Sequence, residues 1–267
     1  MLSFSEASLM EHSLSYSIID SSLRSERQLG ERFSTSTSNG YIKGKVEVMA
    51  NALKPLIIVG AGGLGREVAW LVTDINRQKP EWNFIGFVDD GVQGNTVEGY
   101  PVLGPVEYLL NMPDDVWAVV AIADARIRKL IVEQIQKSGK KLATLVHPTV
   151  SMSDYVNIGA GSIICSGAVL TTNVILGISN IVNLGCFIGH DTELKDFVSL
   201  MPAANLAGEV RAGEGCYFGL NSCVINRTAI GEWSVIGAGA TVIDDIPAYS
   251  LAVGVPARVI RSLKGEE

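Results

Sequence analysis

A histidine beside a carboxylate is the first feature of this sequence that could do chemistry. His190 precedes Asp191, and the 267 residues contain only three histidines. No Lys, Arg, Asp or Glu occurs in residues 155–189. A neutral imidazole, with an ordinary pKa of about 6.5, can accept a proton near neutral pH. A neighbouring carboxylate can orient the ring or stabilise the imidazolium. The pair is therefore a candidate general base with its orienting partner, although a lone surface histidine is the simpler alternative.

A glycine-rich turn is the second such feature. GAGGLG (60–65) follows the apolar run Leu56–Val59 and precedes a helical pattern. Glycines permit a tight turn and close approach of a phosphate, and a helix N-terminus favours an anion. Acidic residues that follow later strands can hold a ribose or a base. The alternative for the glycines is that they only allow the helix to pack closely on the sheet. The substrate-binding candidates here are Gly60, Gly62, Gly63, Gly65, Asp89 and Asp90.

Alternating strands and helices must position this turn. We predict an α/β, Rossmann-like nucleotide- or sugar-binding domain over residues 55–148, with a parallel sheet. The predicted strands are 56–59, 84–88, 101–103, 117–122 and 142–146, and the predicted helices are 66–77, 106–110 and 125–138. At about 93 residues, this unit is too short for two mononucleotide-binding halves, which disfavours a nicotinamide enzyme.

A period of six residues runs through the rest of the chain. Every sixth position from Ile158 to Val242 is apolar, and all but two of these positions are Ile, Leu or Val. A small or β-branched residue follows four positions later, with Asn180 as the exception. Such a repeat predicts a left-handed parallel β-helix over residues 152–260, in which three hexads close one coil. Gly208 then lies one coil from His190. We attribute the glycines after the aliphatic positions to turning of the backbone, and we expect a short C-terminal helix or tail.

Composition narrows the class further. The net charge is −7 without a dense Lys/Arg stripe, which gives no sign of nucleic-acid binding. The sequence predicts no membrane insertion, because repeated Asn, Gly and Ser interrupt the charge-free run. It predicts no signal peptide, because the N-terminus lacks a basic start followed by an apolar block. We expect a cytoplasmic protein whose four cysteines are reduced and buried. Residues 1–48, with twelve serines among the first 40, are predicted to be a weakly ordered arm, and Met49 is a plausible true start.

The chain resembles a known family. The period-six run, NLGCFIGHD (183–191) and GVPARVI (254–260) resemble hexapeptide-repeat acyltransferases. GAGGLGREV (60–68) narrows this to acetyltransferases that modify sialic acid or nucleotide-linked amino sugars, of the pilin-glycosylation and bacillosamine-pathway type. The resemblance covers about residues 55–263. It implies a homotrimer with active sites between subunits, acetyl-CoA as co-substrate, no metal, and a product for surface polysaccharide or glycan biosynthesis.

The resemblance also implies roles for individual residues. His190 would be the general base and Asp191 its partner. The acceptor would be a sugar nucleotide held at the glycine turn, with Asn183 near the base. Asp124, ahead of Arg126 and Arg128, would line the same cleft. The residues implied for acetyl-CoA are Gly208 at the thioester oxygen, Leu220 at the pantetheine arm, and Gly239, Pro256 and Arg258 at the far end. Some relatives carry a histidine at the positions of Leu64 and Ser199 and a glycine at the position of Ala123, so the resemblance identifies neither the sugar nor the need for a nucleotide.

Two alternatives stand beside this interpretation, and a third class of protein is rejected. O-acetylation of sialic acid or another surface sugar is a close variant of it. A non-catalytic hexapeptide-repeat scaffold is a second alternative. A γ-type carbonic anhydrase shares the solenoid but needs three zinc-binding histidines, whereas His190 is the only histidine in the wall. His147, in LVHPTV (145–150), is expected to be structural.

Overall fold

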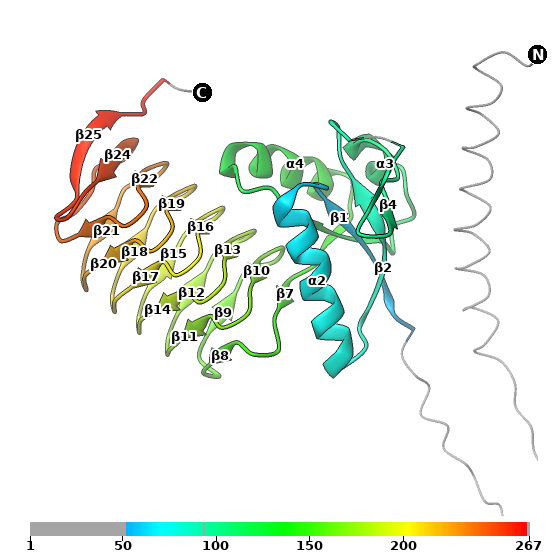
Figure 1. The fold of residues 1–267 in the computed structure, drawn as a ribbon, viewed down its shortest axis with the longest axis horizontal. Helices are drawn as coiled ribbons and strands as arrows, with labels where there is room; N and C mark the ends of the chain where they lie inside the picture. Colours follow the sequence, from blue (N-terminus) through cyan, green and yellow to red (C-terminus); the bar gives the residue numbers. More distant parts are fainter. Residues whose placement is uncertain (1–51, 93, 266–267) are drawn as a thin grey trace, which may run out of the picture. The chain divides into compact units, whose positions relative to one another are not determined.

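The computed structural model describes residues 52–92 and 94–265 (Figure 1). The predictions for the serine-rich arm and for Met49 lie outside these residues. Two regions follow one another along the described chain: an α/β domain, and a parallel β-helix.

The α/β domain is a four-stranded parallel sheet in the order β2-β1-β5-β6. Its elements are β1 (Lys54–Val59), α2 (Gly63–Gln78), β2 (Trp82–Val88), β3 (Thr96–Val97), β4 (Tyr100–Pro101), α3 (Val106–Leu110), β5 (Trp117–Val120), α4 (Ala125–Lys137) and β6 (Lys141–Leu142). Successive side chains of β1 point to opposite faces. Leu56 and Ile58 therefore join α2 in one apolar cluster, and Ile57 and Val59 join α3 and α4 in another.

The β-helix has about six coils. Its strands are β7 (Leu145–Val146), β8 (Ser151–Met152), β9 (Asn157–Ile158), β10 (Ile163–Ile164), β11 (Val169–Leu170), β12 (Ile175–Leu176), β13 (Ile181–Val182), β14 (Phe187–Ile188), β15 (Glu193–Leu194), β16 (Ser199–Leu200), β17 (Asn205–Leu206), β18 (Arg211–Ala212), β19 (Tyr217–Phe218), β20 (Cys223–Val224), β21 (Ala229–Ile230), β22 (Val235–Ile236) and β23 (Thr241–Val242), followed by β24 (Ser250–Val253) and β25 (Arg258–Ser262).

Three parallel sheets form the walls of this β-helix. The domain face, which packs on the α/β domain, contains β7, β10, β13, β16, β19, β22 and β24. The second face contains β8, β11, β14, β17, β20 and β23, and the third face contains β9, β12, β15, β18 and β21. Each strand pairs with the strand one coil further on; Ile188, for example, lies opposite Leu206.

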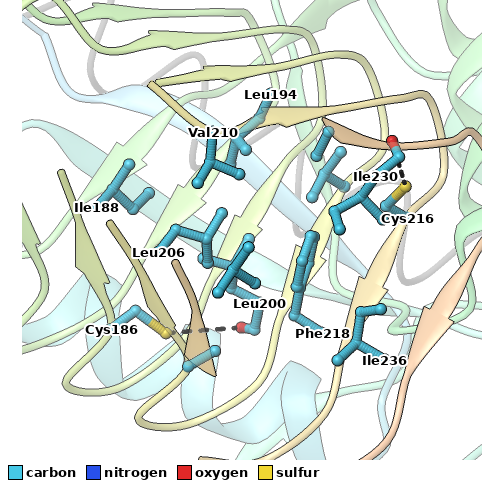
Figure 2. Packing of buried hydrophobic residues seen from close by; sticks show 14 of the residues in the cluster. Cys186, Ile188, Leu194, Leu200, Leu206, Val210, Cys216, Phe218, Ile230 and Ile236 are labelled. Atoms are coloured by element: carbon cyan, nitrogen blue, oxygen red, sulfur yellow. Dashed lines mark hydrogen bonds between the residues drawn. The ribbon is translucent and has the colours of Figure 1, made fainter. Parts of the chain in front are cut away.

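The predicted aliphatic column is the core of the β-helix. Ile188, Leu194, Leu200 and Leu206 converge from the three walls, with no more than 1% of any side chain exposed (Figure 2). Asn180, the exception in the second column, is also buried. Its Oδ1 accepts a hydrogen bond from the Val198 N–H at 2.6 Å, one coil away. The polar side chain therefore bonds adjacent coils together.

Our explanation of the repeat glycines was wrong. The left-handed backbone (positive φ) falls three residues after the aliphatic position, as at Asn173 and Asp191, and not at the glycine next to it. Gly189 is needed for another reason: a Cβ there would lie 2.5 Å from the Gly208 nitrogen of the next coil. Close stacking of the coils, rather than turning, explains such glycines.

Three further details differ from the expectations. The strand predicted over 142–146 is two strands: β6 belongs to the α/β sheet, and β7 starts the β-helix. The C-terminal segment is not a helix, because β25 pairs antiparallel with β24. Cys223 is exposed, whereas the other three cysteines are buried and unpaired.

A buried arginine joins α4 to the β-helix. Arg128 has no exposed surface, and burial lowers the pKa of its guanidinium to about 10. It donates to the carbonyl oxygens of Ser179 (3.0 Å) and Phe197 (2.6 Å) and to Ser199 Oγ (2.9 Å) in the β-helix. Its Nη1 donates to Ile122 O at 2.6 Å, in the loop after β5. A single cation therefore fixes that loop to the wall.

Candidate active site

His190 lies on the corner between the second and third faces, two residues after β14; we call this the histidine corner. Its side chain is 57% exposed. The His190 Nδ1 atom is 2.8 Å from Asp191 Oδ2. The hydrogen bond from His190 lowers the pKa of the Asp191 carboxyl below its usual range, and a second bond, from Asn173, adds to this effect.

This contact determines how the imidazole can act. An ionised carboxylate only accepts hydrogen bonds, so the proton of a neutral His190 ring lies on Nδ1. The lone pair is then on Nε2. That atom faces the next coil, where a Cβ on Gly208 would lie 2.5 Å from it. The geometry therefore presents an unprotonated nitrogen, oriented by a carboxylate, beside a residue without a side chain.

The Gly208 backbone is buried against the imidazole ring. Its carbonyl accepts from the Arg227 N–H at 3.0 Å, but within the described part of the chain its own N–H has no acceptor. A free N–H beside a general base can stabilise a developing oxyanion.

Asn173 is a residue of this site that the sequence analysis missed. Its Nδ2 donates to Asp191 Oδ1 at 3.0 Å across one coil. The signal was available, because the two residues are 18 apart, the spacing that also places Gly208 beside His190. A cavity of about 390 Å³ adjoins this group and is lined by Asp191, Glu209, Arg211, Arg227, Thr228 and Ala229.

Other predicted residues lie on a different corner. Asn183, Leu220 and Gly239 follow strands of the domain face, at the turn into the second face, which we call the leucine corner. Leu220 is 53% exposed, and its carbonyl accepts from the Gly239 N–H at 2.8 Å. Asn183 is nearly buried, and its Oδ1 accepts from the Leu184 N–H. Within one chain, the second face separates these three residues from His190.

The C-terminal candidates belong to the last hairpin. Pro256 lies in the turn between β24 and β25. Arg258 begins β25, and its Nη1 lies 3.4 Å from Asp244 Oδ2 on the surface. Its guanidinium is 61% exposed and accessible to an anion.

The glycines of the turn divide into two kinds. Gly62 and Gly63, at the N-terminus of α2, are exposed, and nothing lies within 4 Å of a Cβ built on either. Gly60 has φ +99°, and a Cβ on Gly65 would overlap the Gly60 carbonyl. The packing explanation therefore holds for Gly65, whereas Gly62 and Gly63 leave open space for a ligand.

The acids near this turn already have partners. Asp89 Oδ2 accepts from the Ala61 N–H at 2.8 Å, which ties the turn to the end of β2. Asp90 Oδ1 accepts from the Val106 N–H at 2.8 Å, at the start of α3. Asp124 caps α4 through the Arg126 and Ile127 N–H groups. These carboxylates hold the loops at the carboxyl edge of the sheet. Arg128 is buried and does not line that edge.

His147 has two side-chain partners at the junction with α2. Its Nδ1 lies 2.8 Å from Thr149 Oγ1 and its Nε2 lies 3.2 Å from Asp74 Oδ2, with 8% of the residue exposed. These contacts agree with a structural role. Among the described residues, no three His, Cys, Asp or Glu side chains group as a metal site would require. None of the described helices combines the length and apolar character that crossing a bilayer demands.

The fold is a β-helix built from hexads, as expected of a hexapeptide-repeat acyltransferase, and it carries a histidine–carboxylate pair on one corner. Residues 55–135 match the sequence model of the PglD N-terminal domain. The chain is 31% identical over 211 residues to a GDP-perosamine N-acetyltransferase of Escherichia coli O157:H7, covering 76% of this chain and 95% of that protein.

Solved structures agree with this match. The acetyltransferase domain of PglB from Neisseria gonorrhoeae FA1090 is 35% identical with a TM-score of 0.74, covering 78% of this chain and all of that one. PerB from Caulobacter crescentus, in complex with CoA and GDP-perosamine, is 29% identical with a TM-score of 0.73, covering 79% and 99%. The chain therefore belongs to the left-handed β-helix family of sugar acetyltransferases, and it is an acetyl-CoA-dependent acyltransferase.

Proposed function

We propose that this protein transfers the acetyl group of acetyl-CoA to the amino group of a nucleotide-linked sugar, with His190 as the general base. The observation that carries the proposal is the orientation of His190: Asp191 holds Nδ1 at 2.8 Å, and Nε2 lies beside Gly208, which has no side chain. Two relatives support this acceptor class: one is a GDP-perosamine N-acetyltransferase, and the other was solved in complex with GDP-perosamine.

Each residue of the histidine corner has a separate role in the proposed acetyl transfer. His190 Nε2 removes the proton that the sugar amine loses as its nitrogen attacks the thioester carbon. Asp191 stabilises the imidazolium that results. The Gly208 N–H donates to the oxygen that gains negative charge, a contribution of about 3 kcal/mol. When the carbon–sulfur bond breaks, His190 returns the proton to the departing thiolate, so the products are an amide and free CoA.

The acceptor's nucleotide is assigned to the glycine turn of the α/β domain. Gly62 and Gly63 offer exposed backbone at a helix N-terminus, where a diphosphate is favoured. We assign the reaction to the cytoplasm and the product to surface polysaccharide or glycan biosynthesis, because both proposed substrates are activated biosynthetic precursors.

A homotrimer completes the site in this proposal. The corners that carry His190 and Leu220 flank the second face within one chain, so a ligand touching both needs a second copy. The outward residues of that face are uncharged in every coil: Ser151, Val169, Phe187, Asn205, Cys223 and Thr241. Phe187 is 39% exposed, which suits burial against another chain.

Release of CoA thiol tests the proposal. Purified protein is given acetyl-CoA with UDP- and GDP-linked amino sugars, or with free sialic acid. We expect turnover with an amino-sugar nucleotide and a loss of about 10²–10⁴-fold in His190→Ala. The unfolding temperature of that variant should lie close to that of the wild type, because the ring is largely exposed and an exposed pair contributes little. Turnover only with sialic acid would favour O-acetylation, and equal turnover in His190→Ala would remove the histidine from the mechanism.

A further inference from the structure

A column of polar residues runs along the histidine corner. Asn173, Asp191, Glu209 and Arg227 occupy the same position in four successive coils, all with left-handed backbone (φ between +56° and +63°). They form two separate pairs. Asn173 donates to Asp191 at 3.0 Å, and Arg227 Nε lies 3.1 Å from both carboxylate oxygens of Glu209.

This pairing gives each of the two stacked acids, Asp191 and Glu209, a partner of its own. Asp191 and Glu209 follow one another in the column, where like charges repel. The charge of Glu209 is matched by Arg227 from the coil beyond, away from His190. Asp191 is left with two partners, one for each oxygen: Oδ1 accepts from Asn173 and Oδ2 contacts His190.

We propose that Asn173 is a positioning residue for acetyl transfer: its amide fixes the Asp191 carboxylate so that His190 keeps its proton on Nδ1 and its lone pair on Nε2. The inference rests on the proposed role of His190 as the base, and it extends the histidine–carboxylate pair across two coils.

The physical need for such a residue comes from exposure. The Asp191 side chain is 50% exposed, so water competes for both oxygens and the carboxylate can rotate away from the ring. An amide held by the previous coil removes this freedom for one oxygen and leaves the other for His190. Asn suits this corner because, after Gly, it tolerates left-handed backbone well, and because its NH₂ group is a donor that a carboxylate can accept.

Asn173→Gly is the sharpest variant, since it removes the amide and retains a residue suited to φ +56°. We expect kcat to fall about tenfold, as for loss of a hydrogen bond to a charged group, with the KM for acetyl-CoA unchanged. Imidazole ¹⁵N spectra of the protein without substrates should show a smaller fraction of the Nδ1–H tautomer of His190. Asn221→Gly, at the same φ of +56° on the leucine corner, is the matched control and should keep the wild-type tautomer ratio.

A double-mutant cycle separates positioning from a general structural effect. If Asn173 acts through Asp191, then Asn173→Gly should not lower kcat any further in an Asp191→Ala background. The proposal is overturned if the tenfold loss persists in that background, or if the tautomer ratio in Asn173→Gly equals that of the wild type. The tautomer measurement needs no turnover, so it decides this inference even if no acceptor is acetylated and the proposed function fails.

Discussion

The Nε2 atom of His190 and the α-carbon of Gly208 lie against each other across one coil of the β-helix, with no room for a Cβ between them. Gly208 does not need a left-handed backbone, so its lack of a side chain serves this contact.

Gly208→Ala should therefore displace the imidazole without disturbing the coil. The added methyl would meet Nε2 at 2.5 Å, so the ring must rotate away from Asp191. We expect kcat to fall by about 10²-fold or more, measured as release of CoA thiol. In a His190→Ala background the methyl has space, so Gly208→Ala should then leave the free energy of unfolding unchanged. Wild-type turnover in the single variant would contradict this account of the contact.

The stability contributed by Asp191 should depend on pH. Its pKa is lowered in the folded protein by the hydrogen bond from His190 and then by that from Asn173. A carboxyl with a lowered pKa stabilises the fold above its unfolded pKa, about 3.9, and loses that contribution as the pH falls through its folded pKa. The wild type should unfold at a slightly higher temperature than Asp191→Asn at pH 7, because exposed pairs contribute little. Thermal unfolding should show this difference disappearing below about pH 4; a constant difference down to pH 2 would refute it.

Removal of the buried guanidinium should be costly. Arg128→Ala leaves the carbonyls of Ser179 and Phe197 without their donor, and we expect a loss of about 3 kcal/mol or more in urea unfolding. Arg126→Ala is the control two residues away. That guanidinium lies 5.4 Å from the Trp233 ring centroid, so its loss should cost at most about 1 kcal/mol. Equal losses in the two variants would mean that Arg128 does not hold the domains together.

A site shared between chains should allow two inactive variants to complement each other. His190→Ala removes the base from the histidine corner, and Leu220→Glu places a charge at the exposed position proposed for the pantetheine arm. Each variant alone should lose at least about 10²-fold in turnover. When they are unfolded together and refolded, mixed trimers contain sites with both corners intact, so part of the wild-type turnover should return. Mass measurement should show that the refolded trimers are mixed. If such trimers recover no turnover, the histidine corner and the leucine corner do not form a site shared between chains.

The period-six pattern by itself determines much of this protein. It predicted the strands, the inward aliphatic column and the stacking of Gly208 beside His190, because each coil repeats the same local backbone geometry. The same spacing could have placed Asn173 beside Asp191. Only the tertiary structure decided the contacts that the six-residue spacing does not encode. Arg128 is buried against the β-helix, where three of its hydrogen-bond acceptors lie 51 to 71 residues along the chain. Gly189 is required by the next coil rather than by its own turn. The three-sided cross-section also puts His190 and Leu220 on different corners, since that depends on how hexads close in space.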